Sequence, residues 1–113
     1  MTLSTGIITT IAGRGISGFN ADRIDATTSR LYKPVGVAVD SLGNVLIADA
    51  ENYRIRKVTV STGIITTIAG TGIAGFTGDG VNATSARLNY VAGIAVDAVD
   101  NFYIADTRNH RVR

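Results

Sequence analysis

Residues 4–13 read STGIITTIAG, and residues 61–70 repeat the same ten letters without a change. The two stretches lie 57 positions apart. When the chain is shifted by this distance, Thr2 aligns with Thr59 and Arg56 with Arg113 without a gap, and more than half of the aligned pairs are identical. The sequence is therefore two copies of one unit, which we divide at residues 1–57 and 58–113.

Each copy has the alternating hydrophobic pattern that is typical of β-strands. In the first copy, residues 35–40 and 45–49 are apolar stretches on either side of a turn, residues 53–60 alternate between apolar and polar, and residues 64–68 are mostly β-branched. Four short antiparallel strands per repeat predict one blade of a β-propeller. The predicted fold class is all-β, with the second copy supplying strands at 92–97, 102–106 and 110–113.

Long connections join the fourth strand of one repeat to the first strand of the next. They cover residues 14–34 and 71–91 and carry Phe19 and Phe76 at equivalent positions. Connections of this length are uncommon unless they have apolar anchors of their own. We therefore expect them to be ordered, with a single helical turn at residues 83–88.

Composition limits the function classes. The chain has 113 residues, no cysteine, one histidine and a formal charge of +2. These values fit a single domain and exclude disulfides, thiolate metal sites and cysteine nucleophiles, and the charge is too small to predict nucleic-acid binding by itself. We expect no transmembrane segment and no signal peptide, and the sequence predicts no cellular location.

The ends of the predicted second and third strands carry a specific pattern. Residues 47–49 read IAD and are followed by Asn52, Arg54 and Arg56, and residues 104–106 repeat IAD before Asn109, Arg111 and Arg113. This pattern resembles the NHL repeat, in particular the long-period form found in bacterial multi-repeat proteins. The resemblance covers the whole chain and implies a β-propeller, usually of six blades, that is used mainly for binding and scaffolding.

Several motifs invite chemical interpretations that we do not favour. Residues 13–18 and 70–75 match the dinucleotide-binding pattern, but no helix is predicted after them, so tight turns are the preferred interpretation. Asp49 and Asp106 occupy the same place in different blades, so we expect turn capping and ion pairs with arginine rather than acid–base catalysis. Oxygen ligands at Asp79 or Asp97 match no full calcium loop. The prediction is therefore no catalytic residue, no metal and no cofactor.

Two blades cannot close a ring. The chain starts with a predicted fourth strand at residues 6–12 and ends within a third strand, after the strands in 92–113. We expect head-to-tail association in which these parts complete one blade, with three chains giving six blades and a tetramer as the alternative. On this interpretation the chain is a self-assembling unit, or an excised or engineered piece of a longer propeller. The predicted intersubunit residues are Ile7, Ile8, Thr9, Thr10, Ile11, Arg111, Val112 and Arg113.

The function that we predict is a noncatalytic, self-assembling scaffold with a binding face for an unknown protein or RNA ligand, and no membrane partner. The alternatives are an RNA-binding propeller surface and, less favoured, a lactonase-like or lyase-like enzyme. The predicted first strands offer apolar side chains instead of metal ligands to the channel. The candidate binding face consists of Arg14, Arg23, Arg30, Tyr32, Lys33, Glu51, Tyr53, Tyr90, Arg108 and His110.

Overall fold

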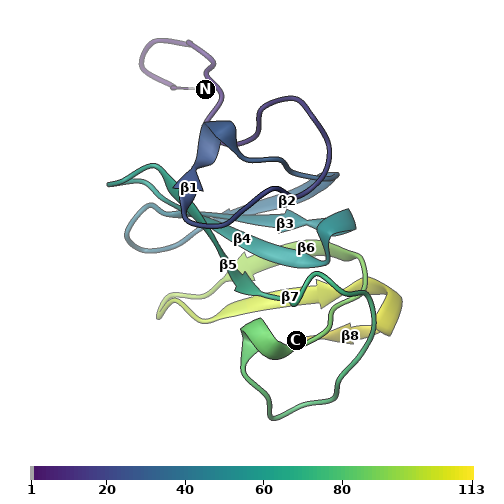
Figure 1. Cartoon of the computed structure of the whole chain (residues 1–113). Helices are drawn as coiled ribbons and strands as arrows, with labels where there is room; N and C mark the ends of the chain where they lie inside the picture. Colours follow the sequence, from purple (N-terminus) through teal and green to yellow (C-terminus); the bar gives the residue numbers. More distant parts are fainter. Residues whose placement is uncertain (1) are drawn as a thin grey trace.

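The computed structural model describes residues 2–113 (Figure 1). The described part is all-β and has no α-helix. The short elements are β-strands and single-turn 3₁₀ helices, labelled η. In chain order they are β1 (Ile24–Asp25), η1 (Ala26–Thr28), β2 (Pro34–Val39), β3 (Val45–Asp49), η2 (Ala50–Asn52), β4 (Arg54–Thr59), β5 (Ile64–Ala69), η3 (Ala83–Ser85), β6 (Val91–Val96), β7 (Phe102–Asp106), η4 (Thr107–Asn109) and β8 (Arg111–Val112).

The first blade is an antiparallel sheet in the order β1-β5-β4-β3-β2. Its four main strands are those that the alternating pattern predicts, with ends shifted by no more than one residue. The sequence pattern missed β1, in which Ile24 pairs with Ile65 on the outer edge of β5. A two-residue strand is too short to give a periodic signal.

The second blade contains three strands in the order β6-β7-β8. The innermost strands β2 and β6 pack side by side, so the two blades lie against each other (Figure 1). A buried apolar cluster fills the space between them, because both blades turn small and branched side chains toward it. Its members are Ala48, Ile55, Ala69, Leu88, Val91 and Ile104.

A second buried cluster lies within the first blade, between its sheet and the long connection. It contains Ala26, Ile47, Val58 and Ile65. Ile65 is fully buried there. Burial of an isoleucine side chain stabilises the folded state by about 1.5–3 kcal/mol. The long connection is therefore packed onto the sheet, as its apolar residues predict.

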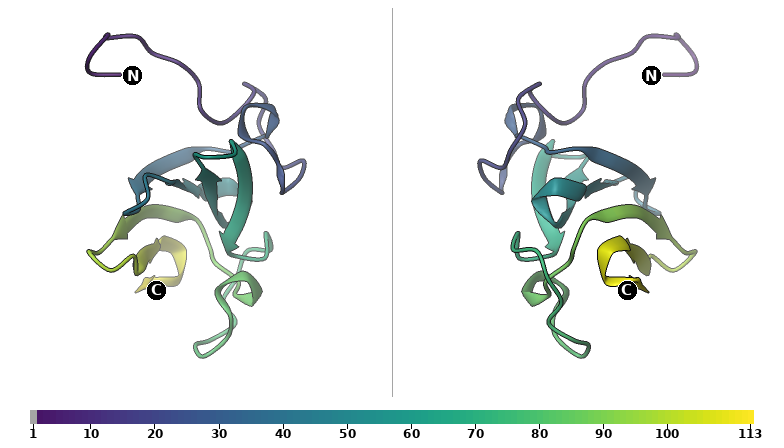
Figure 2. Two further views of the ribbon diagram at one scale, coloured as in Figure 1. Left: turned by 90° about the vertical axis from the view of Figure 1, so that its left-hand side faces the viewer. Right: turned by 90° about the vertical axis from the view of Figure 1, so that its right-hand side faces the viewer.

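The N-terminal segment lies apart from the two blades. We expected a strand at residues 6–12 that pairs with a neighbouring chain; in the single chain this segment forms no strand and runs away from both sheets (Figure 2). A strand needs a hydrogen-bonded neighbour, and none of residues 2–113 pairs with it. Within the described chain, no helix is long and apolar enough to span a membrane.

Candidate functional site

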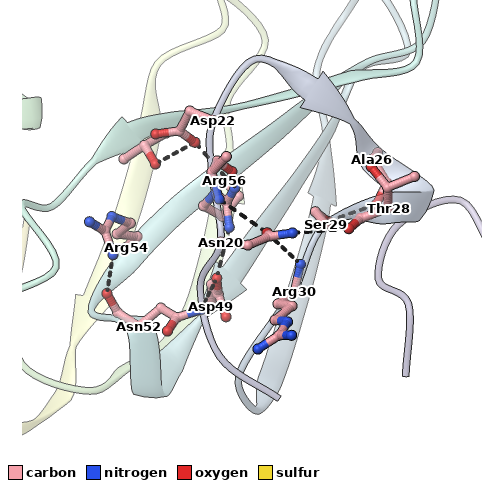
Figure 3. Close-up of polar contacts among 12 residues, drawn as sticks. Asn20, Asp22, Ala26, Thr28, Ser29, Arg30, Asp49, Asn52, Arg54 and Arg56 are labelled. Atoms are coloured by element: carbon pink, nitrogen blue, oxygen red, sulfur yellow. Dashed lines mark hydrogen bonds and ion pairs between the residues drawn. The ribbon is translucent and has the colours of Figure 1, made fainter. Parts of the chain in front are cut away.

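A buried carboxylate at the end of β3 joins the long connection to the first blade. The side chain of Asp49 is fully buried (Figure 3). Its donors are the Tyr32 backbone N–H at 2.7 Å, the Asn52 amide at 2.8 Å and the Arg56 guanidinium at 3.2 Å. The Asn52 amide also donates to the Gly18 carbonyl at 2.8 Å. Asp49 thus positions two separate parts of the long connection.

Arg56 is the second buried member of this cluster. Its guanidinium donates to the Ala21 carbonyl at 2.9 Å and pairs with Asp22 at 3.1 Å. Burial raises the pKa of the Asp49 carboxyl, and the hydrogen bonds from Tyr32 and Asn52, together with the charge of Arg56, oppose that rise. The cluster therefore serves to hold the connection against the sheet.

The second blade repeats the arrangement with residues shifted by 57 positions. Asp106 accepts hydrogen bonds from the Asn89 N–H at 2.8 Å and the Asn109 amide at 2.9 Å, and Arg113 pairs with it at 3.1 Å. The Arg113 side chain is 13% exposed, whereas that of Arg56 is 0% exposed. The predicted pairing of these aspartates with arginine is confirmed. The predicted turn capping is wrong, because neither carboxylate caps the 3₁₀ turn that follows it; each instead accepts an N–H from the end of a long connection, at Tyr32 and at Asn89.

Each blade also stacks two arginines on a phenylalanine of its long connection. The guanidinium carbons of Arg54 and Arg56 lie 3.8 and 4.8 Å from the centre of the Phe19 ring. The second blade has the same stacks at 3.9 and 4.9 Å, formed by Arg111 and Arg113 on Phe76. Sequence reasoning identified the phenylalanines as apolar anchors but missed the stacking. The available signal was their constant spacing from alternating arginines on the third strand.

The connections between second and third strands meet the ends of the long connections. The Glu51 N–H donates to the Tyr32 carbonyl at 3.0 Å, and the Arg108 N–H donates to the Asn89 carbonyl at 3.0 Å. The η2 turn also packs against β6 of the second blade. We call this surface the loop face. It brings together seven of the predicted binding residues, namely Tyr32, Lys33, Glu51, Tyr53, Tyr90, Arg108 and His110.

Four residues of the loop face have left-handed backbone conformations. The φ angles are 54° at Lys33, 53° at Tyr53, 54° at Tyr90 and 54° at His110. This conformation costs a residue with a Cβ about 1–2 kcal/mol. Because Lys33 matches Tyr90 and Tyr53 matches His110 under the 57-residue shift, the backbone of the repeat imposes the conformation on whichever side chain is present.

The remaining predicted cations lie along the first long connection. Arg14 is exposed beside a cavity of about 600 Å³. Arg23 lies along the outer edge of β5, where its N–H donates to the Ile65 carbonyl at 2.7 Å. Arg30 is half-buried, with its N–H bonded to the Asn20 side chain at 3.0 Å. On the loop face, Arg108 stacks on the Tyr90 ring at 4.6 Å.

The predicted intersubunit residues fall into two groups. Residues 7–11 are exposed and form no strand, and Arg111 and Val112 form β8 at the free edge of the second blade. Arg113 lies beside β8 and exchanges backbone hydrogen bonds with Ile104 at 2.7 and 2.8 Å. The two groups are not in contact within one chain.

The glycine-rich turns after the fourth strands have a structural explanation. Gly70 and Gly72 have φ angles of 91° and 88°. A Cβ on Gly70 would overlap the Tyr53 carbonyl oxygen, and a Cβ on Gly72 would overlap the Arg54 guanidinium. No helix begins at these turns, so the prediction of tight backbone turning is confirmed.

The hairpin turns on the opposite side of the blades connect the two repeats. Asp97 accepts from the Val99 and Asn101 N–H groups, and the hydrogen bond from the Asn101 side chain is the main cause that lowers the pKa of Asp97. Asp100 has a φ of 65° and accepts the Ser41 N–H of the first blade at 2.9 Å. This contact between blades explains an aspartate where the first copy has glycine. Residues 2–113 contain no cluster of three histidine or carboxylate side chains that could hold a metal ion.

Comparison with protein families identifies the repeat. The NHL repeat matches residues 31–58 and 88–113. Among curated proteins, the chain is 36% identical over 83 residues to SUPPRESSOR OF QUENCHING 1 of Arabidopsis thaliana, covering 74% of this chain and 8% of that protein. It is also 36% identical over 87 residues to NHL repeat-containing protein 2 of Bos taurus, covering 75% and 12%. The chain thus spans about a tenth of the length of these relatives.

Solved structures show the same architecture. A protein of unknown function from Bacteroides thetaiotaomicron superposes with a TM-score of 0.78 at 26% identity, over 89% of this chain and 25% of that one. An auxiliary nutrient binding protein from the same species gives a TM-score of 0.74 at 26% identity, over 98% and 29%. The fold of this chain is therefore similar to about a quarter of each of these larger proteins.

Proposed function

The chain belongs to the NHL-repeat family, and from this membership we propose that it is a noncatalytic binding module whose loop face holds a protein partner. One observation carries the proposal. The buried carboxylates of Asp49 and Asp106 are fully engaged by the loops they hold in place, whereas Lys33 and Arg108 on the loop face have no ion-pair partner among residues 2–113. The loop face therefore carries two cations whose charge is open to a partner.

The same arrangement favours a partner with acidic side chains. The loop face combines the cations Lys33 and Arg108 with the aromatic rings of Tyr32 and Tyr53, and Glu51 is its only carboxylate outside the buried clusters. Aromatic and arginine side chains are enriched where proteins bind one another. Charge complementarity with an acidic segment would speed and orient the encounter.

RNA binding is the second candidate, because exposed unpaired cations also attract phosphates. Recognition of single-stranded RNA depends on open aromatic rings on which bases stack. In this chain the Phe19 and Phe76 rings lie against Arg54 and Arg111, and the Tyr90 ring lies against Arg108. On the loop face, Tyr32 and Tyr53 are the rings without an arginine stack among residues 2–113, and we prefer a protein partner, which would use these rings together with Lys33 and Arg108.

The noncatalytic part of the proposal rests on the inner strands. Three valines of β2, at positions 35, 37 and 39, are 44%, 68% and 59% exposed on the innermost strand. Valine side chains supply neither metal ligands nor acid–base groups. A lactonase-like or lyase-like site around a channel would need such groups there.

We also propose that copies of the chain associate into a ring-shaped scaffold, with three chains giving six blades. Light scattering tests this directly, because a mass of three chains supports the trimer and a mass of four chains would change only the number of blades. A mass of one chain at all concentrations would contradict the assembly but leave the loop-face proposal standing.

Binding to the loop face is tested with a labelled polyglutamate peptide and an oligouridine of equal charge. We expect the peptide to bind with an affinity that falls as salt rises, and K33E/R108E to weaken it about tenfold or more, a loss of roughly 1.4 kcal/mol. The control is Lys57→Glu on β4, whose side chain pairs with Asp40; its charge change equals that of each single variant, Lys33→Glu or Arg108→Glu, and is half that of the double variant. Tighter binding of oligouridine than of the peptide would put the RNA candidate first.

A further inference from the structure

The second blade has an open groove where the first blade is filled. A cavity of about 330 Å³ lies between β7, Arg113 and the second long connection. Its wall includes Ala69, Val81, Ala83, Leu88 and Ile104. Under the 57-residue shift these match Ala12, Ile24, Ala26, Leu31 and Ile47, the residues that surround Ile65 and Val58 in the first blade. The groove therefore has the shape and lining of a site for a fourth strand.

The N-terminal segment has the sequence of the missing occupant. Residues 6–13 are identical to residues 63–70, which contain β5. Ile65 is 0% exposed because it fills the first blade, whereas its counterpart Ile8 is 81% exposed. An exposed apolar segment that repeats the sequence of a buried strand is a strong candidate to fill the equivalent groove of another copy.

The backbone edges of the groove also lack a strand partner within residues 2–113. In the first blade β5 lies between β4 and β1, with Ile55 opposite Ala69 and Ile24 opposite Ile65. The corresponding residues of the second blade are Val112 and Val81, and both lack a strand partner on that side within residues 2–113. Val112 is 76% exposed, whereas its counterpart Ile55 is 0% exposed.

The turn that follows the N-terminal segment has the same conformation as the turn that follows β5. Gly13 and Gly15 have φ angles of 93° and 85°, which match those of Gly70 and Gly72. The Gly13 N–H donates to the Ala26 carbonyl at 2.9 Å, as the Gly70 N–H does to Ala83. A Cβ on Gly15 would meet nothing within 4 Å. Tyr53 and Arg54 lie beside the turn at Gly70 and Gly72. The equivalent space beside the turn at Gly13 and Gly15 is thus open.

The groove also contains the Asp79 carboxylate, whose counterpart in the first blade accepts a hydroxyl hydrogen bond. In the first blade the Thr67 hydroxyl donates to Asp22 at 2.9 Å, and the Asp22 side chain is 34% exposed. Its counterpart Asp79 is 81% exposed and, within residues 2–113, pairs only with Arg113, at 3.3 Å. Thr10 is the counterpart of Thr67, so it would supply the missing donor.

From these matches we propose that residues 7–12 of a second copy of this chain enter the groove of the second blade as its fourth strand. Ile8 fills the cavity, Ile7 and Ile8 pair with Asn82 and Val81, and the Thr10 hydroxyl donates to Asp79. The turn at Gly13 and Gly15 receives His110 and Arg111 of the acceptor copy. This inference rests on the assembly part of the proposed function and identifies its contact.

The first test compares I8D with L3D by light scattering. Both variants replace an exposed apolar residue by aspartate, but Leu3 lies outside the proposed strand and is 91% exposed. We expect I8D to reduce the mass from several chains to one while the circular dichroism spectrum remains that of a folded β-protein, and L3D to leave the mass unchanged. If I8D assembles as the unmodified chain does, this contact is wrong and the ring must form through another surface. If the unmodified chain has the mass of one chain throughout, both the contact and the assembly are wrong.

The second test measures register and does not depend on stability. The chain contains no cysteine, so I7C/N82C places two thiols opposite each other only if Ile7 of one copy pairs with Asn82 of another. We expect a covalent series of dimers and trimers on a nonreducing gel. The control L3C/N82C should remain a single chain. Equal cross-linking of the two variants, or none in I7C/N82C, would overturn the proposed pairing.

Discussion

The two blades have nearly the same sequence but differ in how completely they are packed. In the first blade Ile55 and Ile65 are fully buried, whereas their counterparts Val112 and Ile8 are 76% and 81% exposed. The side chains are of the same kind at the same spacing. The difference shows that a strand partner, and not the hydrophobic pattern alone, decides whether such a residue is buried.

The long connections do not show this difference. The aspartate clusters and the arginine stacks have nearly equal geometry in both blades, with Arg–Asp distances of 3.2 and 3.1 Å. Local hydrogen bonds within each repeat are sufficient to build them. The blade therefore has a self-contained part, formed by the connection and the first three strands, and a part that needs a fourth strand.

The strongest test of this comparison is Arg56→Ala set against Arg113→Ala. Removing Arg56 leaves Asp49 buried without a counter-charge, and we expect a loss of about 3–5 kcal/mol of unfolding free energy. Arg113 also pairs with a fully buried carboxylate, Asp106, but its own side chain is 13% exposed and its second partner Asp79 is 81% exposed, so water can partly replace it and we expect a smaller loss. Urea denaturation at neutral pH measures both values. Equal losses would contradict the view that the first blade is the more completely packed one.

Ile65→Ala and Ile8→Ala compare identical side chains in the two states. Ile65→Ala leaves a cavity in the first blade and should cost about 2–5 kcal/mol. Ile8→Ala should cost less than about 0.5 kcal/mol in dilute protein, because Ile8 is exposed in the single chain. Its cost should grow with protein concentration if copies associate through residues 7–12. Thermal unfolding at two concentrations gives the comparison.

Gly70→Ala and Gly13→Ala separate backbone strain from close packing. Both glycines have φ angles near 90°, so each substitution should cost about 1–2 kcal/mol from conformation alone. Gly70 also lies against the Tyr53 carbonyl, whereas Gly13 has only the Leu31 side chain nearby. We expect a further loss of about 1–3 kcal/mol for Gly70→Ala. Equal urea midpoints for the two variants would show that the packing around Gly70 contributes nothing.

The smallest effect concerns the hairpin turn of the second blade. Hydrogen bonds lower the pKa of Asp97 in the folded chain, so the charged carboxylate stabilises the fold above the unfolded pKa of about 4. This contribution is lost as pH falls through the folded pKa. We therefore expect Asp97→Asn to lower the urea midpoint at pH 7 and to lower it less at an acidic pH below the unfolded pKa, where the contribution of the charged side chain declines. The same decrease at both pH values would exclude a contribution from the charge.

Much of the fold could be predicted from sequence because the same repeat occurs twice in the chain. The period and the alternation of residues 53–60 indicate a strand, and the matching positions of Asp49 and Asp106 indicate a structural role. The strand β1 and the stacks on Phe19 could not be predicted in the same way. They depend on where a long connection returns to the sheet, and no local periodicity encodes that return path.

The sequence by itself determined the two-blade repeat, the turns and the residues that can form the loop face. Only the tertiary structure decided that Tyr32 and Lys33 meet Glu51 and Tyr53, and that Ile65 is buried while Ile8 is exposed. The physical reason is that turn and strand preferences act between neighbours along the chain. Burial and backbone pairing instead require a second surface. The residues of that surface are present in the sequence, but only the folded chain determines where they lie.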